Sequence, residues 1–161
     1  MTSVAQGLKV QRAAVADVRA IHELVNGFAR NGEMLPRTLA EIYESLRDFS
    51  VVRDGETLVG CGALHVMWED LAEVRSLAVR EERQGQGLGA LLARAHLREA
   101  KQLGLSTVFA LTYRPAFFER LGFQQADVMT LPRKVWNECY RCPKFPTCNE
   151  IAVVLDLKAA S

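Results

Sequence analysis

The sequence lacks an excess of charge of either sign. Its 20 lysine and arginine residues nearly balance 19 aspartate and glutamate residues, and the formal net charge is +1. Nucleic-acid and membrane binding usually depend on a basic surface, so this balance gives no reason to expect either partner. The composition favours a small polar molecule as substrate.

The sequence also lacks long hydrophobic runs, internal repeats and linkers rich in proline and serine. No segment offers the roughly 20 apolar residues that a membrane-spanning helix needs. The first seven residues, Met-Thr-Ser-Val-Ala-Gln-Gly, show neither a basic nor an apolar leader pattern. We therefore expect a cytoplasmic protein in which residues 1–161 form a single domain. A hydrophobic content of 49% is enough for an ordinary core.

Cysteine is scarce and unevenly distributed. Three of the four cysteines, Cys139, Cys142 and Cys148, lie within ten residues, a pattern unlike a secreted disulfide framework. A structural zinc site would need a fourth ligand, and the three histidines are distant in the sequence. We expect reduced, packed thiols and no metal requirement; a zinc ligand set and a regulatory disulfide are the alternatives.

Hydrophobic periodicity predicts an α/β organisation. Residues 49–79 form an antiparallel meander of three strands, with a polar turn at each junction. Thr38 and Glu41 have the spacing of a capping box, which marks the start of a helix. The expected strands are 8–11, 49–53, 57–68, 71–79, 107–111 and 151–157. One expected helix begins after residue 17, and three others span 38–47, 88–103 and 116–121.

A glycine-rich segment stands where the last meander strand gives way to a long helix. Residues 84–90 read Gln-Gly-Gln-Gly-Leu-Gly-Ala, and glycines let the amides at a helix start approach an anion. A mononucleotide loop would need a lysine and a serine or threonine after the last glycine, and a dinucleotide loop would need a different glycine spacing. Both also belong to parallel strand units, which an antiparallel meander is not.

Residues 77–89 resemble motif A of the GCN5-related N-acetyltransferases. The motif consists of arginine or glutamine, two residues, glycine, one residue, and glycine or alanine, which Gln84, Gly87 and Gly89 match. The resemblance implies an α/β fold in which helices flank a mixed, mostly antiparallel sheet that splays between its fourth and fifth strands. It also implies acetyl-CoA as co-substrate. The alternative is a glycine-rich helix start that binds nothing.

By this resemblance, the loop amides hold the pyrophosphate of acetyl-CoA, and the preceding strand pairs with its pantetheine arm. Phe118 is expected to pack against the cofactor. It stands where many members carry a tyrosine that protonates the CoA thiolate, and phenylalanine has no proton to donate. The implied cofactor residues are Leu77, Ala78, Val79, Gln84, Gly85, Gln86, Gly87, Leu88, Gly89, Ala90 and Phe118.

Glu73 is the candidate catalytic base. An ammonium group must lose a proton before it can attack a thioester. In this family a glutamate at the matching position commonly removes that proton, directly or through water. Strand alternation places Glu73, Arg75 and Leu77 on one face until a bulge intervenes. The alternative is that Glu73 only pairs with Arg75.

One subgroup resembles the chain over nearly its whole length, the short, kinase-less N-acetylglutamate synthases of arginine biosynthesis. It implies acetyl transfer to the α-amine of L-glutamate. Paired arginines suit a dicarboxylate; Arg37 and Arg75 are the candidates, with solvated or internally paired arginines as the alternative. The segments that carry the likeness are 32–37, 59–64, 73–79, 108–112, 117–123 and 131–136.

Two other functions stay open at the level of sequence. A few pocket side chains decide acceptor specificity, so another amino acid or small amine is the first alternative. A sensor that binds acetyl-CoA without turnover is the second; the missing tyrosine favours it and Glu73 argues against it. Dimers are common in the family, and the resemblance therefore allows a homodimer.

Overall fold

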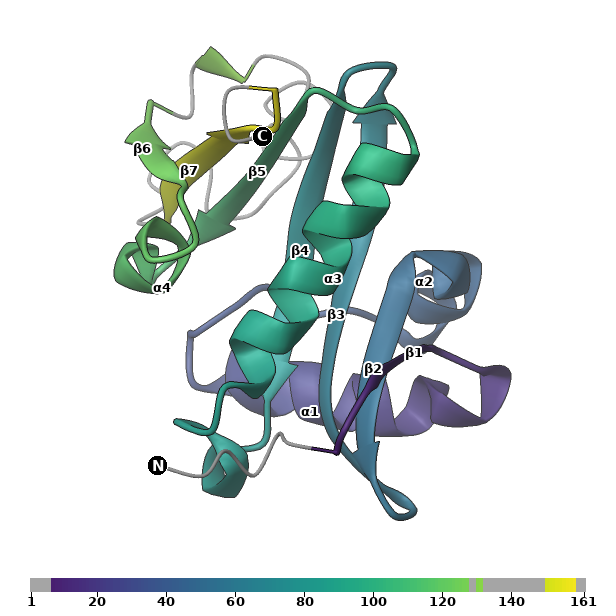
Figure 1. Cartoon of the computed structure of the whole chain (residues 1–161). Helices are drawn as coiled ribbons and strands as arrows, with labels where there is room; N and C mark the ends of the chain where they lie inside the picture. Colours follow the sequence, from purple (N-terminus) through teal and green to yellow (C-terminus); the bar gives the residue numbers. More distant parts are fainter. Residues whose placement is uncertain (1–6, 128–129, 132–149, 159–161) are drawn as a thin grey trace. The chain divides into compact units, whose positions relative to one another are not determined.

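The computed structural model describes residues 7–127, 130–131 and 150–158, which form strands and helices along the chain (Figure 1). The chain folds into two compact units, one containing the described residues up to 65 with 74–99, the other 66–73 with the described residues from 100 onward. The strands are β1 (Val10–Arg12), β2 (Phe49–Asp54), β3 (Thr57–Trp68), β4 (Leu71–Val79), β5 (Thr107–Thr112), β6 (Gln124–Ala126) and β7 (Ile151–Asp156). The helices are α1 (Val18–Arg30), α2 (Leu39–Glu44), α3 (Leu88–Gln102) and α4 (Pro115–Glu119), with short 3-10 helices η1 (Val15–Asp17), η2 (Leu46–Asp48) and η3 (Glu81–Arg83).

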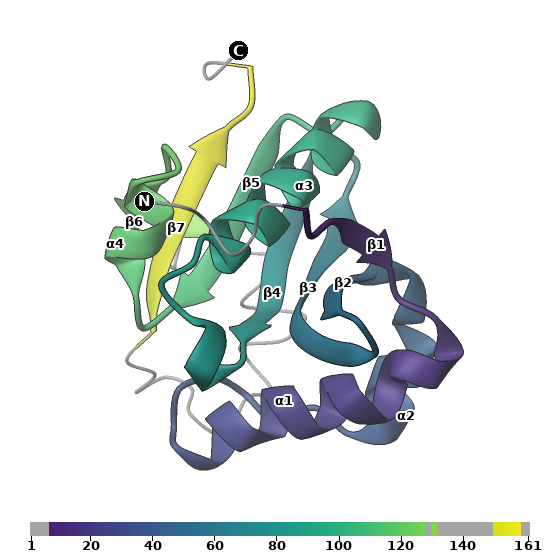
Figure 2. The ribbon, with the colours of Figure 1, turned by 60° about the horizontal axis from the view of Figure 1, so that its bottom comes forward.

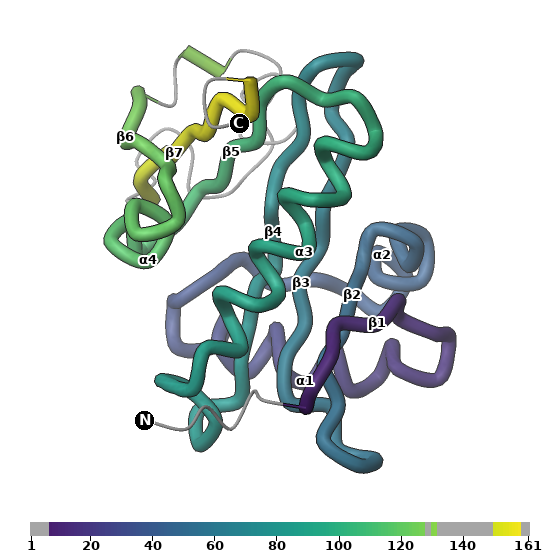
Figure 3. Tube along the Cα trace, in the orientation of Figure 1, coloured from purple at the N-terminus to yellow at the C-terminus, as the bar shows by residue number. Residues whose placement is uncertain are grey.

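An antiparallel meander forms the frame of the first unit. β1 pairs antiparallel with β2, β2 pairs antiparallel with β3, and the hydrogen-bonded order continues to β4, as the trace in Figure 3 shows. The turn between β2 and β3 contains Gly55 at a φ of 64°. That left-handed conformation suits a tight hairpin turn and is open to glycine without steric cost.

Helices cover both faces of this meander (Figure 2). Apolar residues recur on α1 at helical spacing, so one side of the helix buries itself with α2 against the strands. The start of α3 packs against the other face. The buried residues of the first cluster are Val18, Ile21, Val25, Ile42, Phe49, Val51, Leu58, Cys61, Ala63 and Ala78, and those of the second are Val52, Val59, Leu88 and Leu92.

Two glycines of β3 lie directly under α3. A Cβ atom at Gly62 would lie 2.9 Å from His96 Nε2 and 2.9 Å from Leu77 Cδ1, and one at Gly60 would lie 3.1 Å from Leu92 Cδ1. These distances are shorter than ordinary van der Waals contact, so the missing side chains let the helix pack close to the strand.

The second unit contains the start of β4 and the strands that follow it. β4 pairs in parallel with β5 at three positions, the last being Glu73 with Phe109, although β4 continues to Val79 and β5 to Thr112. This early end of the pairing agrees with the splay expected between the fourth and fifth strands. β7 pairs antiparallel with β5 and β6 with β7, in the sheet order β1-β2-β3-β4-β5-β7-β6. The expected α/β fold with a mixed, mostly antiparallel sheet is thus confirmed.

Local sequence signals predict most element boundaries correctly. In the capping box, the Glu41 amide donates to Thr38 Oγ1 at 3.0 Å and the Thr38 amide donates to Glu41 Oε1 at 2.8 Å. α2 ends at Glu44, earlier than predicted, and a 3-10 helix follows it. The sequence did not predict β6, because residues 124–126 are Gln-Gln-Ala and show no apolar alternation.

Asp17 joins the first helix to the meander, and its loss should destabilise the chain. Its carboxylate accepts a 2.7 Å hydrogen bond from the Ala14 amide and pairs with the guanidinium of Arg53 on β2. Asp17 is buried, so Asp17→Ala leaves Arg53 without this partner and should lower the free energy of unfolding by about 2 kcal/mol, measured by urea denaturation. Glu82→Ala is the control, because Glu82 pairs with Arg80 at the solvent surface and should leave the midpoint unchanged. Equal midpoints for both variants would contradict this role of Asp17.

Candidate functional site

The glycine loop follows β4 and leads directly into α3. Its backbone enters the left-handed region twice, with φ of 80° at Gly85 and 88° at Gly87. Helix α3 then begins at Leu88, and the Leu91 amide donates to the Gly87 carbonyl oxygen at 3.0 Å as the first turn forms. A side chain at Gly85 or Gly87 would be strained in these conformations, which explains why glycine occupies both positions.

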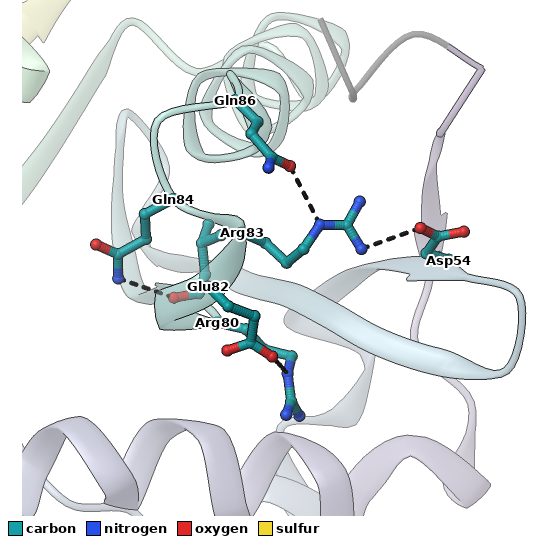
Figure 4. Close-up of polar contacts among 7 residues, drawn as sticks. Asp54, Arg80, Glu82, Arg83, Gln84 and Gln86 are labelled. Atoms are coloured by element: carbon teal, nitrogen blue, oxygen red, sulfur yellow. Dashed lines mark hydrogen bonds and ion pairs between the residues drawn. The ribbon is translucent and has the colours of Figure 1, made fainter.

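Polar side chains hold this loop on two sides (Figure 4). Gln84 Nε2 donates to the Val79 carbonyl oxygen at 3.0 Å, which ties the start of the loop to the end of β4. Arg83 Nε donates to Gln86 Oε1 at 3.1 Å, and Arg83 Nη1 donates to Asp54 Oδ2 on β2 at 3.0 Å. The loop therefore has defined anchors on the strands of the first unit.

The loop has the features of an anion-binding helix start. The first amides of a helix have no intrahelical acceptor, and the helix dipole makes that end positive. α3 is 15 residues long, and apart from Gly85 and its two chain neighbours no heavy atom of the described residues lies within 4 Å of the position a Cβ would take at Gly85. An anion can therefore approach the backbone here without displacing a side chain.

The strand before the loop is irregular at one residue. Ser76 has a φ of 54°, the one positive φ among the described non-glycine residues, and such a residue interrupts the alternation of a strand. The alternation predicted from Glu73 through Arg75 to Leu77 therefore does not continue past Ser76. Arg75 itself is half-buried on β4.

Glu73 is a buried carboxylate at the last paired position of β4. Only 4% of its surface is exposed, and its register partner on β5 is Phe109. Acidic side chains are rarely buried to this extent unless pairing or function keeps them there. The place of Glu73 suits the predicted base, and its role stays a prediction.

Arg37 lies in the connection between α1 and α2 and is held by its backbone. Asn26 of α1 donates from Nδ2 to the Arg37 carbonyl oxygen at 2.8 Å, and the Arg37 amide donates to Asn26 Oδ1 at 3.0 Å. Arg37 Nε is buried and has no hydrogen-bond partner within the described residues. The sequence does not predict this role of Asn26, because a single asparagine on a helix gives no signal for a contact eleven residues away.

Phe118 lies inside an aromatic cluster of the second unit. Its ring centroid is 5.0 Å from that of Phe117 and 5.2 Å from that of Phe123, with interplanar angles of 88° and 72°. Phe118 is buried, so these edge-to-face contacts give it a packing role that needs no ligand. Contact with a cofactor stays a prediction.

A pocket of about 330 Å³ lies in the first unit between α1 and η3. Leu24 and Phe28 of α1 line it together with Arg80 and Glu82, and it contains none of the site residues predicted from the sequence.

Among the described residues, no three histidine, cysteine, aspartate or glutamate side chains are placed to hold a metal ion. The cluster Cys139, Cys142 and Cys148 lies outside the described residues. No helix in the described part of the chain has the length and apolar character to cross a membrane.

The chain matches a family model and several named proteins. Residues 16–123 match the model described as the acetyltransferase (GNAT) family. The chain is 38% identical over 148 residues to an uncharacterized N-acetyltransferase of Chlorobaculum tepidum, covering 92% of this chain and 96% of that protein. It is 37% identical over 135 residues to an amino-acid acetyltransferase of Mycobacterium tuberculosis, covering 82% and 77% of the two chains.

Solved structures that contain coenzyme A have a fold similar to that of the chain. A Mycobacterium tuberculosis protein in complex with CoA and a second ligand aligns with a TM-score of 0.79 at 31% identity, over 91% of this chain and 98% of that one. The N-acetylglutamate synthase of Neisseria gonorrhoeae, in complex with coenzyme A and N-acetylglutamate, aligns with a TM-score of 0.81 at 26% identity. That alignment covers 93% of this chain and 35% of the synthase chain.

Proposed function

Because the chain belongs to the GCN5-related N-acetyltransferase family, we propose that it transfers the acetyl group of acetyl-CoA to the α-amine of L-glutamate. The glycine loop at the start of α3 carries the donor half of this proposal. Its two left-handed glycines and the open space at Gly85 suit the pyrophosphate of CoA. The acceptor half is supported by the likeness to the amino-acid acetyltransferase of Mycobacterium tuberculosis and to the synthase bound to N-acetylglutamate.

Donor binding is assigned to the backbone of β4 and the loop. The amides from Gln84 to Ala90 bind the pyrophosphate, and the β4 backbone from Leu77 to Val79 pairs with the pantetheine amides. Acetyl-CoA supplies an activated acetyl thioester, so no metal is needed to activate the carbonyl group. The two units act as one catalytic domain in this proposal, and β4 runs through both of them.

Glu73 is proposed to act as the general base. It takes a proton from the substrate ammonium, and the freed amine forms a bond to the thioester carbonyl carbon. The tetrahedral adduct loses the second ammonium proton to solvent and collapses, the carbon–sulfur bond breaks, and the CoA thiolate leaves and takes a proton from solvent. Phe118 cannot supply that proton. Arg37 and Arg75 are proposed to bind the two carboxylates of glutamate through their planar guanidinium groups.

One assay tests the substrate and separates it from the alternatives. The protein is incubated with acetyl-CoA and a panel of amino acids, polyamines and other amines, and release of CoA thiol is followed against a blank without amine. We expect release with L-glutamate and much less with D-glutamate or L-lysine. A preference for another amine would refute glutamate as the acceptor, and CoA binding without any release would indicate a sensor.

A further inference from the structure

Arg83 connects the glycine loop to the neighbouring hairpin. It is the last residue of η3 and stands directly before the loop. Its guanidinium reaches Gln86 inside the loop through Nε and Asp54 at the end of β2 through Nη1, at 3.1 and 3.0 Å (Figure 4). One planar group thus joins the loop to Asp54, which precedes Arg83 by 29 residues in the sequence.

The burial of Arg83 distinguishes it from an ordinary surface arginine. Its side chain is 17% exposed, whereas Arg80, three residues earlier, is 46% exposed and pairs with an exposed Glu82. Arg83 Nη2 is buried without a hydrogen-bond partner in the part of the chain that the structure describes. Burying an arginine with an unused donor costs free energy, so the contacts of Nε and Nη1 have to offset that cost.

The loop needs an external support of this kind. Gly85 and Gly87 add no side-chain packing, and glycine loses more conformational freedom on ordering than any other residue. Gln84 holds the start of the loop on Val79, and Gln86 is held by Arg83. Removing the second contact frees the middle of the loop, where the amides must converge on one anion.

We propose that Arg83 is a positioning residue for the donor substrate, which keeps the loop amides in the arrangement that binds the pyrophosphate of CoA. This inference rests on the proposed use of acetyl-CoA. Asp54 offsets the charge of Arg83. Arg83 therefore supports CoA binding through geometry, because its planar guanidinium donates to the loop and to β2 at the same time. Lysine has a single ammonium group and cannot reproduce this geometry.

The test compares a donor that has the pyrophosphate with one that lacks it. Arg83→Met keeps the apolar stem and should raise the Kd for CoA about tenfold by isothermal titration calorimetry. The kcat/KM for acetyl-CoA should fall by a similar factor, while kcat/KM for S-acetylpantetheine stays within about twofold of the wild type. Arg83→Lys should behave like Arg83→Met. Asp54→Asn, at a half-exposed position, should weaken CoA binding in the same direction by about threefold.

Arg12→Met is the matched control. Arg12 donates to Glu99 at 2.6 Å on the same unit, so its loss also removes an arginine–carboxylate pair, and CoA affinity should not change. Unchanged CoA affinity in Arg83→Met and Asp54→Asn would overturn the inference, as would equal losses with both thioesters. A wild-type protein that does not bind CoA would instead refute the proposed function.

Discussion

Glu73→Gln is expected to lower kcat by about 10²- to 10³-fold, because positioned general bases contribute roughly this much to proton-transfer catalysis. Glutamine has nearly the shape of glutamate and can fill the same buried position, but it does not take a proton at neutral pH. The KM for acetyl-CoA and the Kd for CoA should stay near wild-type values. Activity should recover partly at high pH, where more of the amine is already deprotonated.

Glu69→Gln is the control for this variant. Glu69 lies in the exposed turn between β3 and β4, in the same unit as Glu73, and the same chemical change there should leave kcat unchanged. Thermal denaturation of both variants separates catalysis from stability. Wild-type turnover in Glu73→Gln near neutral pH would show that another group is the base, and a parallel loss of CoA affinity would indicate a structural role for Glu73.

Gly62→Ala is expected to lower the free energy of unfolding by about 2 kcal/mol, the usual size of an overpacked core. The added Cβ would lie 2.9 Å from Nε2 of His96, whose ring is fully buried on α3 and cannot turn aside easily. For a chain of 161 residues this corresponds to a fall in Tm of about 4–8 °C, measurable by calorimetry. Relief of the contacts requires the side chains of His96 and Leu77 to shift or α3 to move away from β3.

Two other glycine variants calibrate this prediction. Gly60→Ala should cost less, because its nearest contact would be Leu92 Cδ1, the far end of a flexible side chain, at 3.1 Å. Gly27→Ala should raise stability by about 0.5–1 kcal/mol, since alanine is the better helix former and, outside the backbone of its own helix and among the described residues, the Cβ would meet only Arg30 Nη2, at 3.8 Å. A Tm of Gly62→Ala at or above that of Gly27→Ala would contradict close packing of α3 on β3.

Sequence periodicity was sufficient for the fold but not for the contacts that shape the site. The meander, the glycine loop and the capping box at Thr38 depend on residues close in the chain, so their patterns are readable. The contact of Arg83 with Asp54 depends on tertiary folding, and no local pattern indicates which arginine becomes buried. The left-handed conformation of Ser76 also has no local signal, because serine rarely adopts it.

Some residues of the candidate site could be predicted from local sequence, and the contacts of others depend on tertiary folding. The loop from Gln84 to Ala90 has the predicted surroundings at the start of α3, because glycine spacing and strand context are properties of the local sequence. Glu73 has a place that suits its predicted role. The backbone support of Arg37 by Asn26 and the aromatic contacts of Phe118 emerge only once the chain is folded, and periodicity cannot distinguish packing roles from ligand roles at such positions.

The buried thiol of Cys61 makes β3 suitable for following local opening of the chain. Cys61 is fully buried, its Sγ lies 3.5 Å from the Ser76 carbonyl oxygen, and burial raises its pKa to about 12. Only the thiolate reacts rapidly with disulfide or alkylating reagents, so Cys61 should not react while the buried cluster that it shares with α1 and α2 stays packed. In a chain whose Cys139, Cys142 and Cys148 are replaced by serine, the labelling rate of Cys61 would report the free energy of opening this cluster. Measured with and without CoA, that rate would show how strongly a bound ligand stabilises this part of the core against local opening.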